Sequence, residues 1–304
     1  MINYGIIVGL LSALLQSVSY LFARKFSSEY QNSNIRLLVS SQILMGIAGL
    51  FALPFCWPAH IDWNWSWIQP VILCVFFSLA GQLLIFFALY SAEASKISPL
   101  LALKVVMIAF LTWWMMGIPL NYLHWLGVLL CLVGTFILNF SGGGISRRAI
   151  IGVLGACLFY SLSDINITIL VENLESQMSS RWGAVFFSVC AIYILCGVLC
   201  AFCMFFVKEA KWSDLKGSAV GFSLAWLIAM VFMFATFSIV GTVYGNILQS
   251  MRGIISIFLG VLIASKGHQH IEAHMPRKVF LRRLIAALIM TAAIAAFGAG
   301  GLHA

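Results

Sequence analysis

The sequence predicts an all-α membrane protein with ten transmembrane helices, arranged as two inverted five-helix repeats. Three observations predict this fold. Hydrophobic residues make up 62% of the 304 residues and charged residues 9%, with a mean hydropathy of +1.05. The chain contains ten apolar stretches, and each is close to the roughly 20 residues that a helix needs to cross a bilayer. These stretches also divide into two halves of five.

The composition excludes a water-soluble globular domain, because such domains contain about 25% charged residues. The net charge of +8 would suggest nucleic-acid binding in a soluble protein. Here the basic residues lie in short loops between apolar stretches, where they meet anionic lipid headgroups. We therefore expect the lipid bilayer as a partner and no nucleic acid.

All ten stretches are expected to be helices, since runs such as Val71–Phe77 are apolar on every side and lack the alternation of a transmembrane barrel strand. The prolines lie at or beyond the ends of the stretches, and Ser98–Pro99 fits the start of a helix. The predicted spans are Ile6–Phe22, Leu37–Phe55, Ile68–Tyr90, Pro99–Met116, Leu123–Phe140, Ile150–Val171, Trp182–Val207, Val220–Val240, Tyr244–Ala264 and Val279–Phe297.

The loop charges predict the orientation. Nearly all loop Lys and Arg residues fall in the odd-numbered loops, whereas the even-numbered loops contain only Arg181. Because short cytoplasmic loops retain basic residues, the odd loops are expected to be cytoplasmic and both termini to lie outside. A multi-pass protein of the cell inner (plasma) membrane is the predicted localisation.

The two halves are expected to form two repeats, residues 1–143 and residues 144–304. A glycine-rich hinge, Ser141–Ser146, separates them. An odd number of spans in each repeat gives the repeats opposite orientations. Such inverted duplication places a transport site near the midplane, at the interface between the repeats.

Two cations lie inside predicted spans, and they align when the halves are superimposed. Lys104 is in the fourth span and Arg252 is in the ninth. A charged side chain in hydrocarbon costs from about 2.5 to more than 10 kcal/mol, so such a residue usually faces a cavity, a partner or a substrate. For Lys104, extension to the cytoplasmic interface is the alternative.

The residues that accompany Arg252 are polar. Gln249 and Ser256 lie three and four residues from it, on the same face of a helix, and Asn246 lies one turn further on. A guanidinium suits a carboxylate or phosphate, and an ammonium supplies a point charge. The sequence therefore predicts a substrate-binding site for an anion.

Asp164 is the only acid deep within a predicted span, and Tyr160 lies one turn before it. Three roles stay open for Asp164: an ion-pair partner of Arg252 or Lys104 in the empty carrier, a proton-coupling carboxylate, or a structural hydrogen-bonded group. Tyr160 is a candidate substrate contact. Gln16 and Gln82 are expected either to bridge helices or to contact substrate.

We expect no metal and no cofactor. Residues His268, His270, Glu272 and His274 have a spacing that could bind zinc, but a solvated loop is the ordinary explanation. The cysteines lie in apolar stretches, where thiols pack as small hydrophobic groups. The sequence contains no nucleophile elbow, phosphate loop or metal-binding helix motif.

Several segments resemble the EamA-like branch of the drug/metabolite transporter superfamily. They are the opening GIIVGLLSALLQ (Gly5–Gln16), the segment ALYSAEASKIS (Ala88–Ser98) and the start of the fifth span, WLGVLL (Trp125–Leu130), all within the five-plus-five pattern. Members often carry a Gly-Glu pair after the fourth helix, where this chain has Gly117-Ile-Pro. Many members also keep their termini inside.

The resemblance implies a secondary carrier for small organic metabolites that works by alternating access. Together with the cations, it predicts a transporter of an anionic or zwitterionic small molecule and no enzymatic activity. An intramembrane enzyme or lipid-modifying protein, a structural role and an exporter of cationic or amphiphilic drugs are the alternatives. A homodimer also stays open, because Gly127 and Gly134 share one face of the fifth span.

Overall fold

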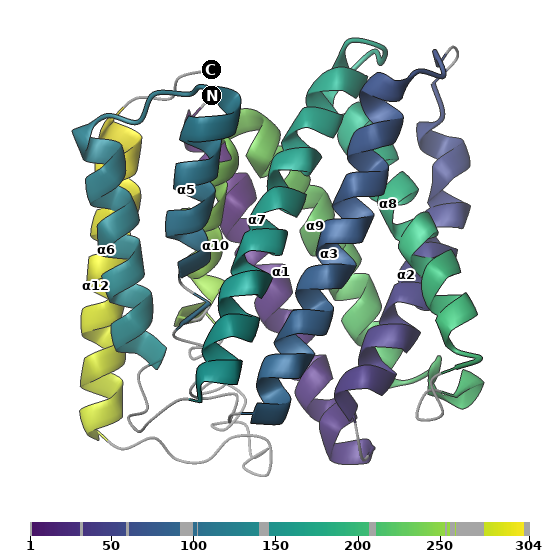
Figure 1. Ribbon diagram of the computed structural model, residues 1–304, viewed down its shortest axis with the longest axis horizontal. Helices are drawn as coiled ribbons and strands as arrows, with labels where there is room; N and C mark the ends of the chain where they lie inside the picture. The colour runs from purple at the N-terminus through teal and green to yellow at the C-terminus, as the bar shows by residue number, and fades with distance from the viewer. Residues whose placement is uncertain are drawn as a thin grey trace.

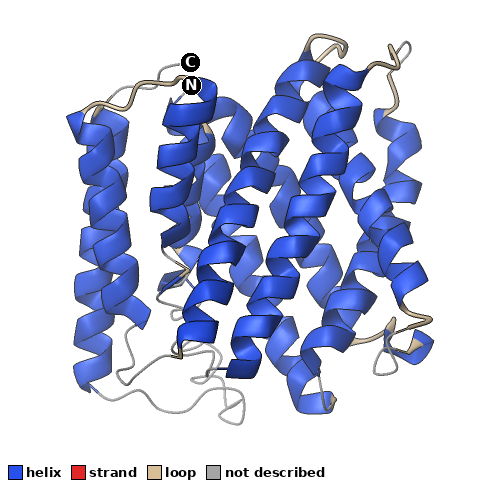
Figure 2. Cartoon of the chain, in the orientation of Figure 1, coloured by secondary structure: helices blue, strands red, loops and turns tan. Residues whose placement is uncertain are grey.

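The described part of the chain is a bundle of long helices lying side by side and contains no strand (Figures 1 and 2). The computed structural model describes residues 2–30, 33–58, 61–91, 100–101, 103–139, 146–206, 211–252, 254–255, 259 and 277–300. Its elements are α1 (Ile2–Glu29), α2 (Ser33–Cys56), α3 (Trp65–Ser91), α5 (Leu103–Met116), α6 (Tyr122–Asn139), α7 (Arg147–Glu175), α8 (Arg181–Cys203), η1 (Trp212–Asp214), α9 (Ser218–Val240), α10 (Thr242–Ser250) and α12 (Arg277–Ala299).

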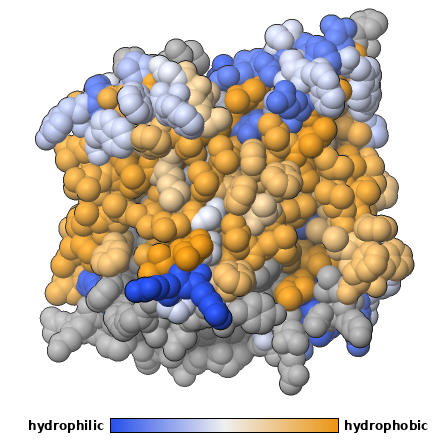
Figure 3. Space-filling model, in the orientation of Figure 1, coloured by the Kyte–Doolittle hydropathy of each residue, from blue (hydrophilic) through white to orange (hydrophobic). Residues whose placement is uncertain are grey.

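The helices have the length and composition of membrane spans. Six of them, α1, α2, α3, α7, α8 and α9, are long and apolar enough to cross a bilayer, and shorter apolar segments lie within α5, α6 and α12. Figure 3 shows the apolar surface as a broad belt with hydrophilic residues beyond it. A multi-pass membrane protein is therefore confirmed, while the number of ten spans stays a prediction.

Most of the core described lies in two large clusters of buried side chains. The larger one joins α1, α2, α3, α7, α8 and α9 and includes Leu170, Phe187 and Phe234. The second joins α5, α6, α10 and α12 and includes Tyr244 and Phe297, whose rings stack 5.2 Å apart. Helices α1, α7, α5 and α10 meet near the boundary of these clusters, which is where the predicted site residues lie.

Two predicted spans differ from the single continuous helices that hydropathy suggests. In the fourth, Leu101 is a turn residue and α5 begins only at Leu103, where the amide of Lys104 donates to the Leu101 carbonyl over 3.1 Å. In the ninth, α10 ends at Ser250, and the amide of Met251 donates to the Leu248 carbonyl over 3.1 Å. Hydropathy does not detect such turns, because it is averaged over a window of about 19 residues that is longer than the turn.

Candidate functional site

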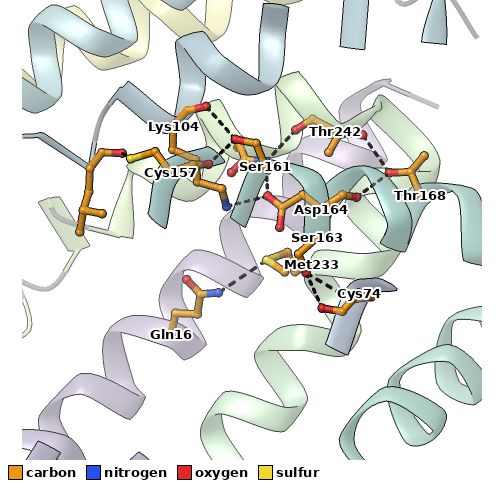
Figure 4. Close-up of polar contacts among 12 residues, drawn as sticks. Gln16, Cys74, Lys104, Cys157, Ser161, Ser163, Asp164, Thr168, Met233 and Thr242 are labelled. Carbon is orange, nitrogen blue, oxygen red and sulfur yellow. Dashed lines mark hydrogen bonds and ion pairs between the residues drawn. The ribbon is translucent and has the colours of Figure 1, made fainter. Parts of the chain in front are cut away.

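The predicted acid and one predicted cation form an ion pair in the middle of the bundle. The Lys104 Nζ atom, in the first turn of α5, lies 2.6 Å from Oδ2 of Asp164 on α7 (Figure 4). Asp164 is 5% exposed, whereas the side chain of Lys104 is 25% exposed. Lys104 therefore turns to a buried carboxylate and does not extend to the interface.

A third helix, α10, contributes a hydrogen bond to the carboxylate of this ion pair. The Nδ2 atom of Asn246, on α10, donates 2.8 Å to the same Asp164 oxygen and 3.0 Å to the carbonyl of Thr242. One turn along α7, the hydroxyls of Thr168 and Thr242 are hydrogen-bonded over 2.8 Å. Asp164 is thus held by α5 and α10 together, and a hydrogen-bonded ion pair of this kind is the form in which buried charge is tolerated.

Arg252 has different partners, which come from α1. Its Nη1 atom donates 3.1 Å to Oε1 of Gln16, and its guanidinium carbon lies 6.0 Å from the centre of the Tyr20 ring. The hydroxyl of Ser17 donates 3.0 Å to the Arg252 carbonyl. Among the residues that the structure describes, no carboxylate pairs with Arg252, so most of its five N–H donors are not used by the protein.

Gln249 contacts the same helix one turn further along. Its Nε2 atom donates 2.6 Å to Oγ of Ser12, and that hydroxyl donates 2.8 Å to the Ala229 carbonyl on α9. The Oε1 atom of Gln249 is buried and has no hydrogen-bond partner among the described residues, and Gln249 is 5% exposed. A buried acceptor without a partner costs about 1–3 kcal/mol and is available to a ligand that brings a donor.

Tyr160 connects the two groups of residues. Its ring centre lies 5.8 Å from Lys104 Nζ, within the range of a cation–π contact. It also lies close enough to Tyr20, Arg252 and Asp164 to interact with each of them electrostatically. The two cations therefore flank one aromatic side chain, although each has its own first partner.

The structure brings together most of the predicted residues. Lys104, Asp164, Asn246 and Tyr160 form one group, and Arg252 and Gln249 join α1 beside it. Of the two ion pairs left open for Asp164, the structure contains the one with Lys104. Ser256 and the segment His268–His274 lie outside the described residues.

Sequence reasoning named Gln16 of α1 as a residue that bridges helices or contacts substrate, but it missed Ser12 and Tyr20 on the same helix. Ser12, Gln16 and Tyr20 are spaced by four residues, so they lie on one face of a helix, and all three turn to the Gln249–Arg252 segment or to Arg252 itself. This spacing is visible in the sequence and could have identified them. Gln82, the other amide, lies in α3 with a buried Oε1 atom that has no hydrogen-bond partner within the described ranges.

Comparison with known proteins gives a family match over part of the chain and a similar fold. Residues 3–140 match the model of the EamA-like transporter family, which confirms the resemblance that the sequence motifs suggested. No curated protein matches the chain significantly. One solved structure, described as "Crystal structure of protein", has 17% identity to this chain and a TM-score of 0.64, over 97% of this chain and 98% of the other. At that identity the likeness concerns the fold alone.

Proposed function

We propose that this protein is a membrane transporter of the drug/metabolite type, because residues 3–140 match the EamA-like transporter family. It is a secondary active transporter that moves a small anionic or zwitterionic organic metabolite across the inner membrane by alternating access. No catalytic step is part of this proposal.

The packing of the helices supports two inverted repeats, residues 1–143 and residues 144–304, with five spans each. If the first half, α1, α2, α3, α5 and α6, is matched in order with α7, α8, α9, α10 and α12, the most extensive helix contacts map onto one another or onto themselves. The α1–α9 pair corresponds to α7–α3, and α1–α10 corresponds to α7–α5. The α2–α8, α5–α10 and α6–α12 pairs map onto themselves. Paired exchange of this kind is the contact pattern expected of two halves related by a two-fold axis.

The observation that carries the substrate class is Arg252. It is a cation within an apolar bundle, its side-chain hydrogen bond to the described residues goes to the neutral amide of Gln16, and the nearby carboxylate is occupied by Lys104. A permanent guanidinium in such a place is stabilised by an anion that arrives from outside. A substrate carboxylate or phosphate fits its unused donors in a bidentate arrangement.

Two further features fit the same substrate. The unpartnered Oε1 atom of Gln249 suits a hydroxyl or ammonium donor on the substrate, which is why a zwitterion is included. Asp164 neutralises Lys104 while the site is empty, and a bound anion would compete with Asp164 for that ammonium. In this account Asp164 is the counter-ion of the empty carrier, and Tyr160 and Asn246 position the two charges.

A ligand screen followed by one conservative substitution tests the proposal. Small metabolites that bind the folded protein raise its melting temperature by mass action, and we expect the hits to be anions or zwitterions. Arg252→Lys keeps the positive charge but loses the planar set of guanidinium N–H donors. It should therefore weaken binding of a compound found in the screen about tenfold, or about 1.4 kcal/mol. Arg181→Lys, at a partly buried ion pair with Glu175 in the connection between α7 and α8, is the matched control and should leave binding unchanged.

A cationic hit that binds Arg252→Ala better than the parent would contradict the proposal. It would favour instead an exporter of cationic drugs, with Asp164 as the binding carboxylate.

A further inference from the structure

An apolar groove opens on the outside of the bundle between α5 and α7, away from the Arg252 and Asp164 side chains. It has a volume of about 450 Å³ and is lined by Met107, Phe110 and Leu111 of α5 and by Ile151, Leu154, Gly155 and Leu158 of α7. Ile151 is 68% exposed and Phe110 is 50% exposed. The face toward the viewer in Figure 3 carries the apolar belt, and Figure 1 places α5 and α7 on that face. In a membrane this groove therefore faces lipid.

The α7 side of the groove continues into two arginines. Arg147 and Arg148 open α7, and both are exposed. Ile151 follows them by four and three residues, and Leu154, Gly155 and Leu158 continue the same face of the helix. In the part of the chain that the structure describes, no carboxylate forms an ion pair with either arginine.

The dimensions suit a phospholipid. At a rise of about 1.5 Å per residue, the arginines stand about 5 Å below Ile151, and the groove then runs about 10 Å along α7 to Leu158. A glycerophospholipid has the same order of parts, with a phosphate at the interface and an acyl chain that begins a few ångströms deeper. Arginine favours phosphate because its donors form a planar fork.

From this combination we infer that the α5–α7 groove is a binding site for an anionic glycerophospholipid. One acyl chain lies between Phe110 and Leu158, and the phosphate is bound by Arg147 and Arg148. The loop charges predict that these arginines lie on the cytoplasmic side, where anionic lipids are enriched in many membranes. The site is separate from the substrate site, although Met107 of the groove lies one turn from Lys104.

Native mass spectrometry of the purified protein, titrated with phosphatidylglycerol or phosphatidylcholine, tests the headgroup. The parent should retain phosphatidylglycerol preferentially. At about fivefold in affinity per basic residue, the Arg147→Gln/Arg148→Gln double variant should bind it roughly thirtyfold more weakly. Lys216→Gln removes an exposed charge from the same end of the bundle and should leave the affinity unchanged.

The acyl chain is tested by filling the groove. Leu158→Trp should reduce phosphatidylglycerol binding, whereas Leu288→Trp, at a 65% exposed position of α12 outside the groove, should not. Melting in phosphatidylcholine checks that each variant folds. If the double arginine variant does not fold, the inference is tested by the parent's preference for phosphatidylglycerol and by the two tryptophan variants.

Equal retention of both lipids by the parent would overturn the inference, as would full competition by soluble glycerol phosphate, which would indicate a site for free phosphate. Unchanged binding in the folded arginine variant or in Leu158→Trp would overturn it as well.

Discussion

At the scale of single residues, the two cations of the site differ in their partners: within the described part of the chain, Lys104 has an anionic partner and Arg252 does not. Lys104 has a short ion pair with Asp164, and Asn246 hydrogen-bonds to the same carboxylate oxygen. Arg252 has an amide and an aromatic ring instead. An ion pair that is buried on one side is costly to break by removing one partner, because the other charge is then left alone. This difference leads to a test of stability that needs no substrate.

Lys104→Met should destabilise the protein by about 3 kcal/mol, because it leaves the Asp164 carboxylate buried without a cation. The double variant Lys104→Met/Asp164→Asn removes both charges and should recover most of that loss. Melting of the purified variants measures the cycle, and the exposed Lys216→Met is the control for loss of a lysine. If the double variant were as unstable as the sum of the two single variants, Lys104 and Asp164 would not depend on each other.

At the scale of elements, the sequence predicted the helices well and their interruptions poorly. Continuous apolar runs predict α1, α2, α3 and α7 to within a few residues, because a bilayer demands that length of any spanning helix. The turn at Leu101 has no signal of its own in the apolar pattern, and the polar residues around the end of α10 at Ser250 indicated a binding site and not a helix end. Which cation Asp164 would meet was equally hidden, because depth in a helix does not specify the neighbouring helix.

The contact between α2 and the η1 segment is an element-scale feature outside the apolar belt. The guanidinium of Arg36 binds Asp214 through two hydrogen bonds, of 2.9 and 2.5 Å, and the Lys211 amide adds a third of 3.1 Å. Burial alone would raise the pKa of Asp214, but these hydrogen bonds and the charge of Arg36 outweigh it and hold the pKa below its ordinary value. The connection between α8 and α9 is thereby fixed to the start of α2.

Asp214→Asn should lower the stability at pH 7 by about 1–3 kcal/mol, the range for hydrogen bonds to a charged group. Because the folded pKa is depressed, the stabilisation is fully present above the unfolded pKa of about 3.9 and is lost as the pH falls through the folded pKa. The melting difference between parent and variant should therefore shrink below about pH 4. Asp62→Asn, at an exposed carboxylate, is the control. A difference that stays constant at acid pH would mean that the charge of Asp214 contributes nothing.

At the scale of the whole molecule, the bundle sets its two ends apart by charge. Helix α1 begins and helix α12 finishes at the same end of the bundle (Figure 1). Helix α7 begins and helix α8 finishes at the opposite end. Arg147 and Arg148 lie at that second end, together with Lys211 and Lys216. The rule that basic residues stay inside predicts that this second end is cytoplasmic.

Cysteine labelling tests the orientation directly. A thiol at Asp62→Cys, between α2 and α3, should react with a membrane-impermeant reagent added from outside. A thiol at Ser213→Cys, between α8 and α9, should react only after the membrane is opened. Cys56 and Cys203, the native thiols that are not buried, are replaced by serine in both variants. The reverse labelling pattern would overturn the predicted orientation and put the termini inside, where many family members keep them.

The central claim is that the protein carries a small organic anion or zwitterion through a site that depends on Arg252. The most direct measurement is exchange in proteoliposomes. The vesicles are loaded with an unlabelled compound from the ligand screen, and the labelled form of that compound is added outside. We predict saturable uptake by the parent and by Arg181→Lys, and its loss in Arg252→Ala. Uptake by Arg252→Ala equal to that of the parent would contradict the claim, as would a transported hit that carries no negative charge.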